Sequence, residues 1–373
     1  MRILVVNWQD WTHPRAGGAE FHLREVFGRL ARRSHRVDLL CTRFDGAPAA
    51  ESMEGINVIR RGGAYELFNY AVPRAWRVLR KNGYDVVVDD LNKVPFYSPL
   101  FVDRPVVALV HHLFGATIFE ETNPLFGAYL WLSERPVARV YGKSPFIAVS
   151  DSTADDLTAR GIPRGRITVI PNGLPVLDWE RYLSIPKDEE PLFVYLGRIK
   201  RYKRLELALE AFVRIVAQYP DARLVIAGDG DHRPALEHQV ERLGLDGRVQ
   251  FPGWLDDDAK WRLLRRAWAL LYTSPKEGWG VSSLEAQRVG TIAIVSDVPG
   301  LRDTVIDGET GRIVPHADVT ALARVMGEAI SHPDQRRAME GRAARRAAGF
   351  SWERAADDTL EVLEAAAAGG AGA

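Results

Sequence analysis

Residues 3–41 read ILVVNWQDWTHPRAGGAEFHLREVFGRLARRSHRVDLLC, and this stretch decides the class of fold. It holds two apolar runs typical of buried strands, at 3–7 and 36–41. Between them, residues 19–34 place apolar side chains at helical spacing. Two parallel strands need a crossover connection, which is usually a helix. The stretch therefore predicts a strand–helix–strand unit of a parallel sheet that is covered by helices.

The same alternation repeats along the rest of the chain. In the first half, further strands are predicted at 58–60, 86–89, 106–111, 146–149 and 167–170. The second half begins the pattern again, with strands predicted at 192–197, 223–227, 249–251, 269–272, 292–296 and 311–314. Helical spacing separates most of these runs. We therefore predict an α/β protein with two Rossmann-like, doubly wound parallel-sheet domains.

The length agrees with two domains, because 373 residues exceed the ~250–300 at which a single hydrophobic core usually stops growing. Residues between Gly173 and Pro191 lack periodicity and contain two prolines, which is typical of a connection between domains. The predicted parts are an N-terminal Rossmann-like domain (1–173), a linker (174–190), a C-terminal Rossmann-like domain (191–350), a C-terminal helix that packs back toward the first domain (351–366) and a disordered tail (367–373).

The composition narrows the partners and the compartment. Lys plus Arg equals Asp plus Glu, at 49 each, so no net positive field indicates nucleic-acid binding. The single cysteine, Cys41, cannot form an intramolecular disulfide and fits a reducing compartment. We find no signal-peptide region and no apolar run of ~18 residues. We therefore expect a cytoplasmic protein.

The most informative motif is Glu277-Gly278-Trp279-Gly280-Val281-Ser282-Ser283-Leu284-Glu285, which follows a predicted strand and opens a helix. Its glycines let backbone N–H groups approach a ligand, and the start of a helix favours phosphate. Glu285 lies about one turn into that helix, where its carboxylate can accept two hydroxyl hydrogen bonds. The motif alone leaves open a plain turn with two solvated glutamates.

A second motif, residues 195–204, reads YLGRIKRYKR and ends the first strand of the second domain, where open α/β sheets bind ligands. Arg198 and Lys203 can converge on a diphosphate there, one as a fork and one as a point charge. We expect the neighbouring basic residues of this motif to be solvent-exposed and to have no role in binding.

Taken together, the motifs resemble one family. They are Gly17-Gly18-Ala19-Glu20, the strand-end His111, Ile170-Pro171-Asn172-Gly173, Gly197-Arg198 followed by Lys203, and Glu277-Gly278-Trp279-Gly280 followed by Glu285. Their order is similar to that of the retaining glycosyltransferases of family 4, to about Phe350. The resemblance implies the GT-B fold, with an acceptor-binding N-terminal domain and a nucleotide-sugar-binding C-terminal domain across a cleft. It also implies transfer of a hexose from a UDP- or GDP-sugar to a hydroxyl acceptor in glycolipid or polysaccharide biosynthesis, with no cofactor and no metal.

The resemblance also implies roles for individual residues of the second domain. Arg198 and Lys203 match the pair that neutralises the donor diphosphate, and Glu285 matches the residue that holds the ribose. Glu277 and the backbone of Gly278, Trp279 and Gly280 match the segment that grips the donor sugar, while Val281 and Ser282 would offer N–H groups to the distal phosphate. Gly253 and Trp254 match a loop that holds the base through its backbone. The catalytic set is thus His111, Arg198, Lys203 and Glu277.

In the first domain, Gly17 and Gly18 match a glycine loop that closes over the donor phosphates. His111 matches an active-site histidine near the reacting carbon. His112 follows it directly, and consecutive strand side chains point to opposite faces, so only one of the two should face the site. We favour His111.

Three other patterns are weighed. Asp229-Gly230-Asp231 spells the Asp-x-Asp of metal-dependent glycosyltransferases, but two carboxylates are few for a hard cation. Two parallel-sheet domains also occur in NAD(P)-dependent oxidoreductases and epimerases, yet no predicted strand is followed by Gly-x-Gly-x-x-Gly. A sugar-nucleotide-binding protein without catalysis is the third alternative.

Two aromatic stretches, 65–81 and 114–141, raise the question of a membrane. The first combines Leu67, Phe68, Trp76 and Leu79 with Arg74, Arg77, Arg80 and Lys81, a composition compatible with an anionic membrane surface. The second follows His111 and could hold a lipid-linked acceptor, although aromatics at such spacing more often form core. Peripheral contact at the inner face of a membrane stays an open expectation.

Overall fold

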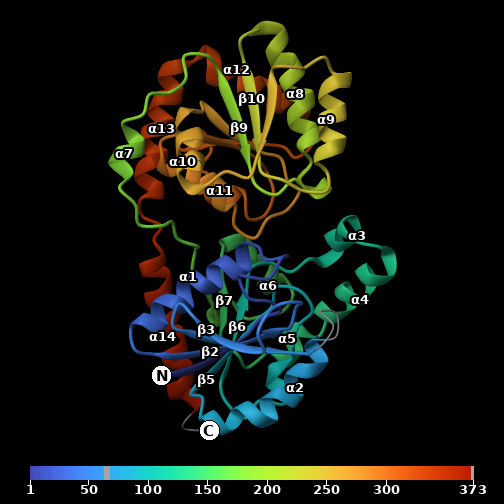
Figure 1. Cartoon of the computed structure of the whole chain (residues 1–373), viewed down its shortest axis with the longest axis vertical. Helices are drawn as coiled ribbons and strands as arrows, with labels where there is room; N and C mark the ends of the chain where they lie inside the picture. Colours follow the sequence, from blue (N-terminus) through green and yellow to red (C-terminus); the bar gives the residue numbers. More distant parts are fainter. Residues whose placement is uncertain (63–67, 371–373) are drawn as a thin grey trace. The chain divides into compact units, whose positions relative to one another are not determined.

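The computed structural model describes residues 1–62 and 68–370 and divides the chain into two units. Unit 1 consists of Met1–Gly173 and Ser351–Ala373, and unit 2 of Leu174–Phe350. Figure 1 shows the helices and strands of each unit and labels most of the helices and several strands. Leu67 and the preceding residues 63–66, which the aromatic stretch at 65–81 includes in part, lie outside the described residues.

Unit 1 is built on an eight-stranded sheet with the order β3-β4-β2-β1-β5-β6-β7-β8. Every pairing is parallel except β3 with β4, which is antiparallel. The strands are β1 Arg2–Val6, β2 Arg36–Thr42, β3 Ala50–Met53, β4 Ile56–Arg61, β5 Val86–Asp90, β6 Val106–Val110, β7 Phe146–Ala148 and β8 Ile167–Val169. The central strands are buried on both faces, as apolar parallel strands under helices should be.

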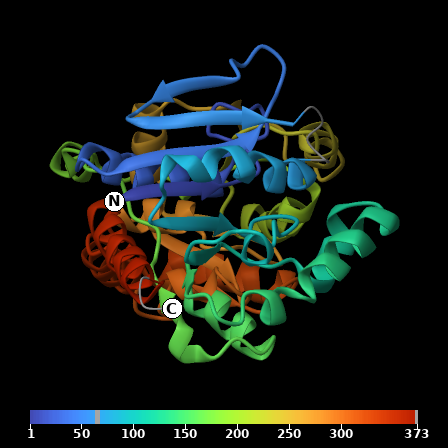
Figure 2. The same cartoon turned by 90° about the horizontal axis from the view of Figure 1, so that it is seen from below.

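Two helices from opposite ends of the sequence cover one face of this sheet. The helices of unit 1 are α1 Gly18–Arg32, α2 Phe68–Leu79, α3 Ile118–Glu121, α4 Pro124–Glu134, α5 Val137–Val140, α6 Asp151–Ala159 and α14 Trp352–Gly370. Helix α14 lies against α1 (Figure 1), and Trp352 and Leu363 join Ile3 and the buried Cys41 in one core cluster. Helices α3 and α4 extend away from the sheet (Figure 2).

Unit 2 has a six-stranded, fully parallel sheet with the order β11-β10-β9-β12-β13-β14. Numbered from its first strand, this order is 3-2-1-4-5-6, the doubly wound arrangement. The strands are β9 Leu192–Leu196, β10 Arg223–Ala227, β11 Val249–Gly253, β12 Ala269–Tyr272, β13 Ile292–Ser296 and β14 Gly311–Val314. The helices are α7 Trp179–Leu183, α8 Leu205–Gln218, α9 Arg233–Arg242, α10 Asp257–Arg266, α11 Val281–Arg288, α12 Val319–Ser331 and α13 Pro333–Ala347.

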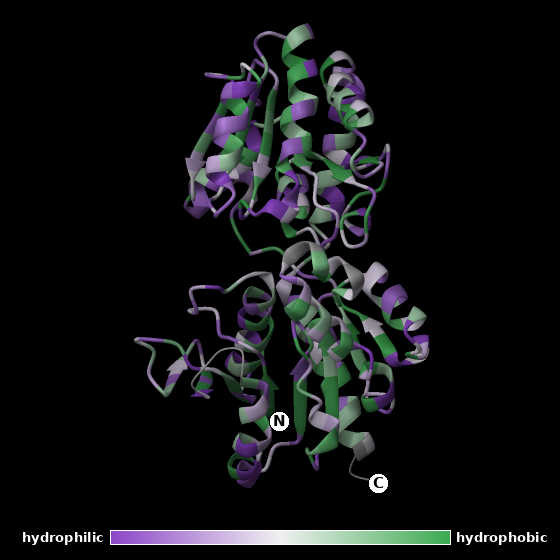
Figure 3. Ribbon diagram, turned by 90° about the vertical axis from the view of Figure 1, so that its right-hand side faces the viewer, coloured by the Kyte–Doolittle hydropathy of each residue, from purple (hydrophilic) through white to green (hydrophobic). Residues whose placement is uncertain are grey.

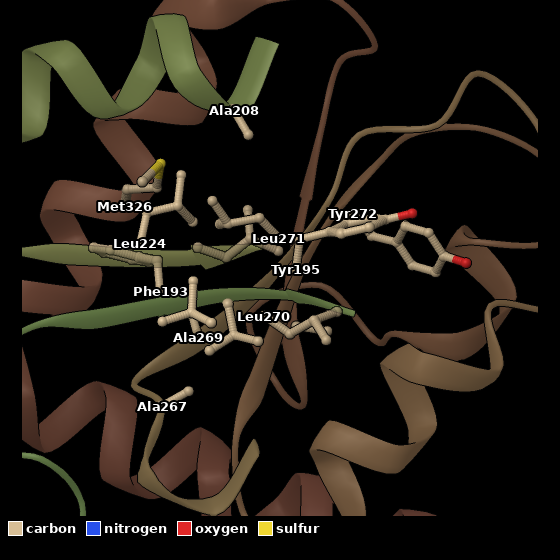
Figure 4. Packing of buried hydrophobic residues seen from close by; sticks show 14 of the residues in the cluster. Phe193, Tyr195, Ala208, Leu224, Ala267, Ala269, Leu270, Leu271, Tyr272 and Met326 are labelled. Atoms are coloured by element: carbon tan, nitrogen blue, oxygen red, sulfur yellow. The ribbon is translucent and has the colours of Figure 1, made fainter. Parts of the chain in front are cut away.

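The core of unit 2 forms where apolar strand side chains meet the helices. Phe193, Leu224, Leu271 and Met326 pack together between the strands and the helices that cover them (Figure 4). The hydropathy colouring shows the same contrast in both units, with apolar strands inside and more polar residues on the outer helices (Figure 3). Each unit therefore buries a core of its own.

Some elements differ from the sequence-based expectation. Strand β3 was not predicted because its residues, Ala-Glu-Ser-Met, carry no apolar alternation and pair only at the sheet edge. The expected linker 174–190 contains α7 and belongs to unit 2. Helix α13 was missed because it is mostly polar and buries few large side chains. Residues 367–370 of the expected disordered tail continue α14.

Candidate active site

The strand order of unit 2 places two loops side by side at the carboxyl edge of the sheet. Strand β9 pairs with β10 on one side and with β12 on the other, so the topological switch point lies between β9 and β12. Ligands of doubly wound sheets bind outside the carboxyl ends of the strands at this point. The loop after β9 carries Arg198 and Lys203, and the loop after β12 carries Glu277.

Lys203 and Glu277 form a buried ion pair, with side chains 8% and 15% exposed. Burial alone would lower the pKa of Lys203, but Glu277 and the surrounding tyrosines raise it well above its usual value. The ammonium lies 4.8 Å from the ring centroid of Tyr202 and 5.4 Å from that of Tyr272. The lysine therefore stays protonated at the switch point, where the Glu277 carboxylate balances its charge.

Tyr195, near the end of β9, and Tyr272, at the end of β12, pack with their rings edge to face and their centroids 6.0 Å apart (Figure 4). The Tyr195 hydroxyl donates to the Arg198 carbonyl at 2.9 Å and so fixes the backbone of that loop. The Arg198 side chain is exposed, and no ion pair to it is found among the described residues. Its guanidinium is thus available to an anion.

Close backbone contacts hold the same loop in place. The N–H of Ile199 donates to the Asp229 carbonyl at 2.9 Å. A Cβ atom on Gly228 would lie 1.9 Å from the Gly197 carbonyl oxygen, so only glycine fits there. The loops after β9 and β10 therefore pack against each other through their backbones.

The glycine motif after β12 leads into α11 as predicted. Gly280 is the N-cap of this helix, and the first-turn N–H groups of Val281 and Ser282 have no carbonyl partner within the helix. The Trp279 side chain turns into the core of unit 2, where its ring lies 5.7 Å from Phe350. Residues 278–280 can therefore contact a ligand only through their backbone. The buried Trp279 side chain holds that backbone in place.

Glu285 points toward α10, where its carboxylate lies 3.0 Å from the Lys260 ammonium. Burial raises the pKa of Glu285, and Lys260 partly offsets that effect. Sequence analysis missed Lys260, because its partner is 25 residues away and only the packing of α10 on α11 brings them together.

Gly253 ends β11 with a positive φ of 78°, and its carbonyl accepts a hydrogen bond from the Gly228 N–H at 2.8 Å. Trp254, the next residue, is 66% exposed. Its ring is therefore free to contact a flat ligand.

In unit 1, Gly17 is the N-cap of α1, and the Glu20 carboxylate accepts a hydrogen bond from its N–H at 2.7 Å. A Cβ atom on Gly18 would meet nothing within 4 Å, so the start of the helix borders open space. Glu20 thus caps the helix that the two glycines begin.

His111 follows β6 and is buried, while His112 is half-buried and packs near Phe114. The His111 Nε2 atom lies 3.6 Å from Asp90 Oδ2, and its ring lies 5.0 Å from that of His22. Burial and His111 together lower the pKa of His22 to about 3, so His22 is neutral. Asp90 was not predicted, although a carboxylate that ends a buried strand is a sequence signal for a polar group at the edge of the sheet.

The Asp-x-Asp sequence has other partners. Asp231 pairs with Lys200 at 2.8 Å, and Asp229 accepts a hydrogen bond from the N–H of Gly230 at 2.8 Å. No group of three or more His, Cys, Asp or Glu residues suited to a metal ion is found within residues 1–62 and 68–370.

Comparison with known proteins gives two family matches. The family described as "Glycosyl transferases group 1" matches residues 183–346, and "Glycosyltransferase Family 4" matches residues 16–176. A D-inositol 3-phosphate glycosyltransferase of Nocardia farcinica is 31% identical over 94% of this chain and 85% of its own length. The chain belongs to glycosyltransferase family 4.

Other relatives of this glycosyltransferase support the same family assignment. A glycogen synthase of Mycobacterium tuberculosis is 28% identical over 99% of this chain and 96% of its own length. The sucrose-phosphate synthase structure from Thermosynechococcus elongatus superposes with a TM-score of 0.77 at 23% identity, over 97% of this chain and 98% of the other. The fold is therefore GT-B, and the protein is a transferase of the glycosyltransferase class, which sets aside the oxidoreductase alternative.

None of the helices in the described part of the glycosyltransferase has the length and apolar character that crossing a membrane requires.

Proposed function

We propose that this glycosyltransferase transfers a hexosyl group from a nucleotide diphosphate sugar to a hydroxyl acceptor, with retention of configuration and without a divalent metal. The observation that carries the proposal is the buried Lys203 ammonium at the switch point of unit 2. A protonated lysine in a desolvated site stabilises negative charge more strongly than it would in water. A departing nucleotide diphosphate has that charge.

The chemistry needs few protein groups. The bond between the anomeric carbon and the diphosphate oxygen breaks, and the acceptor oxygen bonds to the same face of that carbon. The acceptor proton passes to the departing phosphate oxygen. Lys203, Arg198 and the start of α11 hold the resulting charge, while Glu285 holds the ribose. Positive charge from side chains and a helix start replaces that of a metal ion.

The test compares Lys203→Met with Lys200→Met. Lys200 lies on the same loop but is exposed and pairs with Asp231, so its loss controls for general effects on the loop. We expect Lys203→Met to lower kcat by roughly 10²-fold or more, as for loss of other anion-stabilising donors, and Lys200→Met to change it less than about threefold. Release of nucleotide diphosphate from UDP-, GDP- and ADP-sugars is the measurement.

The same assay with EDTA tests metal independence. Activity that survives the chelator supports the proposal, and complete loss that Mg²⁺ or Mn²⁺ restores contradicts it. The names of the relatives differ in their acceptor, glycogen in one and D-inositol 3-phosphate in the other. The acceptor screen therefore includes neutral and phosphorylated sugars and polyols.

We further propose that unit 1 contacts an anionic membrane surface on its cytoplasmic side, as a lipid-linked acceptor would require. Helix α4 exposes large apolar side chains that no described neighbour covers. Leu125 is 86% exposed and Leu132 54% exposed, and Phe126 and Tyr129 are also exposed on this helix. Tyr129 also reaches α2, where it accepts a hydrogen bond from Asn69 at 3.4 Å. Exposed apolar patches of this kind are typical of interaction sites.

Exposed basic residues of the same unit favour anionic lipid. The exposed basic residues of α2, α5 and their flanks are Arg74, Arg77, Arg80, Lys81, Arg135 and Arg139. Glu134, the acidic residue of α4, is buried and pairs with Arg160. Each basic side chain near such a surface contributes about 1 kcal/mol.

Co-sedimentation with vesicles tests the contact. We expect the full chain to sediment with vesicles containing phosphatidylserine and not with phosphatidylcholine alone, and the double variant Leu125→Ser, Leu132→Ser to sediment at least about fivefold less. Val176→Ser is the control, because Val176 is 75% exposed but lies in unit 2. Equal sedimentation of all three proteins would contradict the proposal.

A further inference from the structure

A lysine of α10 pairs with the last residue of the glycine motif, Glu285 of α11. The Lys260 ammonium lies 3.0 Å from Glu285 Oε1 and 3.1 Å from Asp257 Oδ1. The Asp257 side chain is 89% exposed, whereas those of Lys260 and Glu285 are only 19% and 13% exposed. Glu285 is therefore the partner that Lys260 contacts where water is mostly excluded, and this contact is the stronger of the two.

The packing of α10 on α11 brings the two side chains together. Trp261 is 1% exposed, and its ring lies edge to face with that of Trp179 at 4.9 Å. This buried ring fixes the rotation of α10 about its axis. Lys260 is the preceding residue, and its ammonium lies 4.3 Å from the ring centroid of Trp261. The tryptophan thus supports the lysine on the side of α10 that meets Glu285.

Glu285 lies on the same face of α11 as Val281, because residues four apart on a helix are neighbours. Val281 begins the helix, so its N–H is one of the groups left for a phosphate. The Glu285 carboxylate follows about one turn further on, roughly 5 Å along the helix axis. This spacing suits a nucleotide whose phosphate lies at the start of α11 and whose ribose lies beside Glu285.

One oxygen of the Glu285 carboxylate stays available to a ligand. Lys260 contacts Oε1, and no hydrogen bond to Oε2 is found within residues 1–62 and 68–370. Nor does Oε2 belong to the described atoms that are fully buried without a partner, so a ligand can reach it. A carboxylate has about four acceptor positions, and the lysine uses one of them.

We propose that Lys260 is a positioning residue of the nucleotide site, which holds the Glu285 carboxylate in place to accept the ribose hydroxyls. This rests on the proposed function in one respect, the assignment of Glu285 to the ribose. Burial raises the pKa of Glu285, Lys260 lowers it and Asp257 raises it further. Without Lys260, the carboxylate would lose its cation and keep the negative charge of Asp257 nearby. It would then accept hydroxyl groups less well.

The ribose itself provides the test, because a 2′,3′-dideoxy nucleotide keeps the base and the diphosphate but lacks both hydroxyls. If Lys260 acts through Glu285, its loss weakens binding of the ribose form alone. If Lys260 only ties α10 to α11, or contacts the diphosphate itself, its loss weakens binding of both forms.

The matched variants are Lys260→Met and Arg262→Met. Arg262 lies on the same helix, is 47% exposed and pairs with Asp258 at 2.6 Å, so its loss controls for removing a cation from α10. Isothermal titration of the full chain with UDP, GDP and their 2′,3′-dideoxy forms measures binding without turnover. We expect Lys260→Met to weaken binding of the ribose form by about 10- to 100-fold, as for loss of a charge-assisted hydrogen bond. Binding of the dideoxy form should change by less than about twofold, and Arg262→Met should change neither form by more.

Lys260→Arg keeps the charge and should recover most of the preference for the ribose form. Lys260→Gln keeps a hydrogen-bond donor without the charge, and a partial loss of the same preference is expected if Lys260→Met does not fold. Equal weakening of both forms in these variants, or unchanged binding, would overturn the inference. A parent chain that binds both forms equally well would overturn it too, because Glu285 would then not hold the ribose.

The inference and the proposed function fail in different experiments. Transfer that survives Lys203→Met counts against the proposed function alone, since nucleotide binding is measured without transfer. Equal loss of both nucleotide forms in Lys260→Met counts against this inference alone and leaves the role of Lys203 in transfer untouched.

Discussion

At the scale of single residues, the protonation state of a buried group depends on whether an opposite charge lies beside it. Lys203 keeps its charge because Glu277 is beside it, whereas Asp89 in unit 1 has no cation beside it. Burial raises the pKa of Asp89 to about 6, although the hydrogen bonds from Tyr141 and Ser98 lower it in part. The two buried groups, an ammonium and a carboxylate, therefore behave differently because one has an opposite charge beside it and the other does not.

Asp89 gives a pH-dependent prediction. Its folded pKa is raised above the unfolded value, so the folded state binds the extra proton between about pH 4 and 6, and stability falls as pH rises through this window. Asp89→Asn removes this cost. We expect the variant to gain about 2–3 kcal/mol in free energy of unfolding over the parent at pH 7.

Urea unfolding at pH 4 and pH 7 checks this expectation. The advantage of Asp89→Asn should be small at pH 4, where both side chains are neutral. An advantage of equal size at both pH values would show that packing, and not ionisation, is responsible.

At the scale of elements, the sequence predicts those whose apolar pattern is strong. Strands β10, β12, β13 and β14 begin and end where the pattern places them. Strand β3 and helix α13 were missed, because an edge strand and a polar helix owe their conformation to neighbours and not to their own periodicity.

The site, too, is predicted from sequence only in part. Lys203 and Glu277 were both assigned to the donor site from their motifs, but that they pair depends on β9 lying beside β12. Lys260 was missed because only the packing of α10 on α11 brings it to Glu285. Local motifs indicate which chemistry is present, and strand order decides which side chains meet.

Gly228 tests the backbone packing between the loops after β9 and β10. Gly228→Ala would set a methyl group 1.9 Å from the Gly197 carbonyl, which must displace the loop that carries Arg198. We expect the donor KM to rise at least about tenfold, by comparison with other small displacements of binding groups. Gly244→Ala is the control, because Gly244 also has a positive φ, 65°, but a Cβ there meets nothing within 4 Å. Equal effects would mean that the positive φ, and not the contact, is what requires glycine.

At the scale of the whole molecule, unit 1 is discontinuous in sequence. Its last helix, α14, follows the entire second unit, yet Trp352 is 1% exposed and packs with His22 and Phe21 of α1. A Cβ on Gly173 would lie 2.1 Å from the Trp352 backbone nitrogen. The first 173 residues therefore lack part of their own core.

Truncation after Phe350 should consequently destabilise unit 1 and spare unit 2. Trp352→Ala alone should cost about 3–5 kcal/mol, as for other buried tryptophans, while Arg354→Ala, on the exposed side of α14, should change little. Limited proteolysis with mass spectrometry shows which unit is cut. Cleavage that begins in residues 174–350 of the truncated chain would contradict this view.

The only cysteine of the chain lies inside that same core. The Cys41 thiol is buried, and burial together with Asp10 raises its pKa, so it reacts slowly with alkylating reagents while unit 1 is closed. The rate of its alkylation then measures how often unit 1 opens. Alkylation of Cys41 thus reports the opening of unit 1 in the native sequence, without an introduced label.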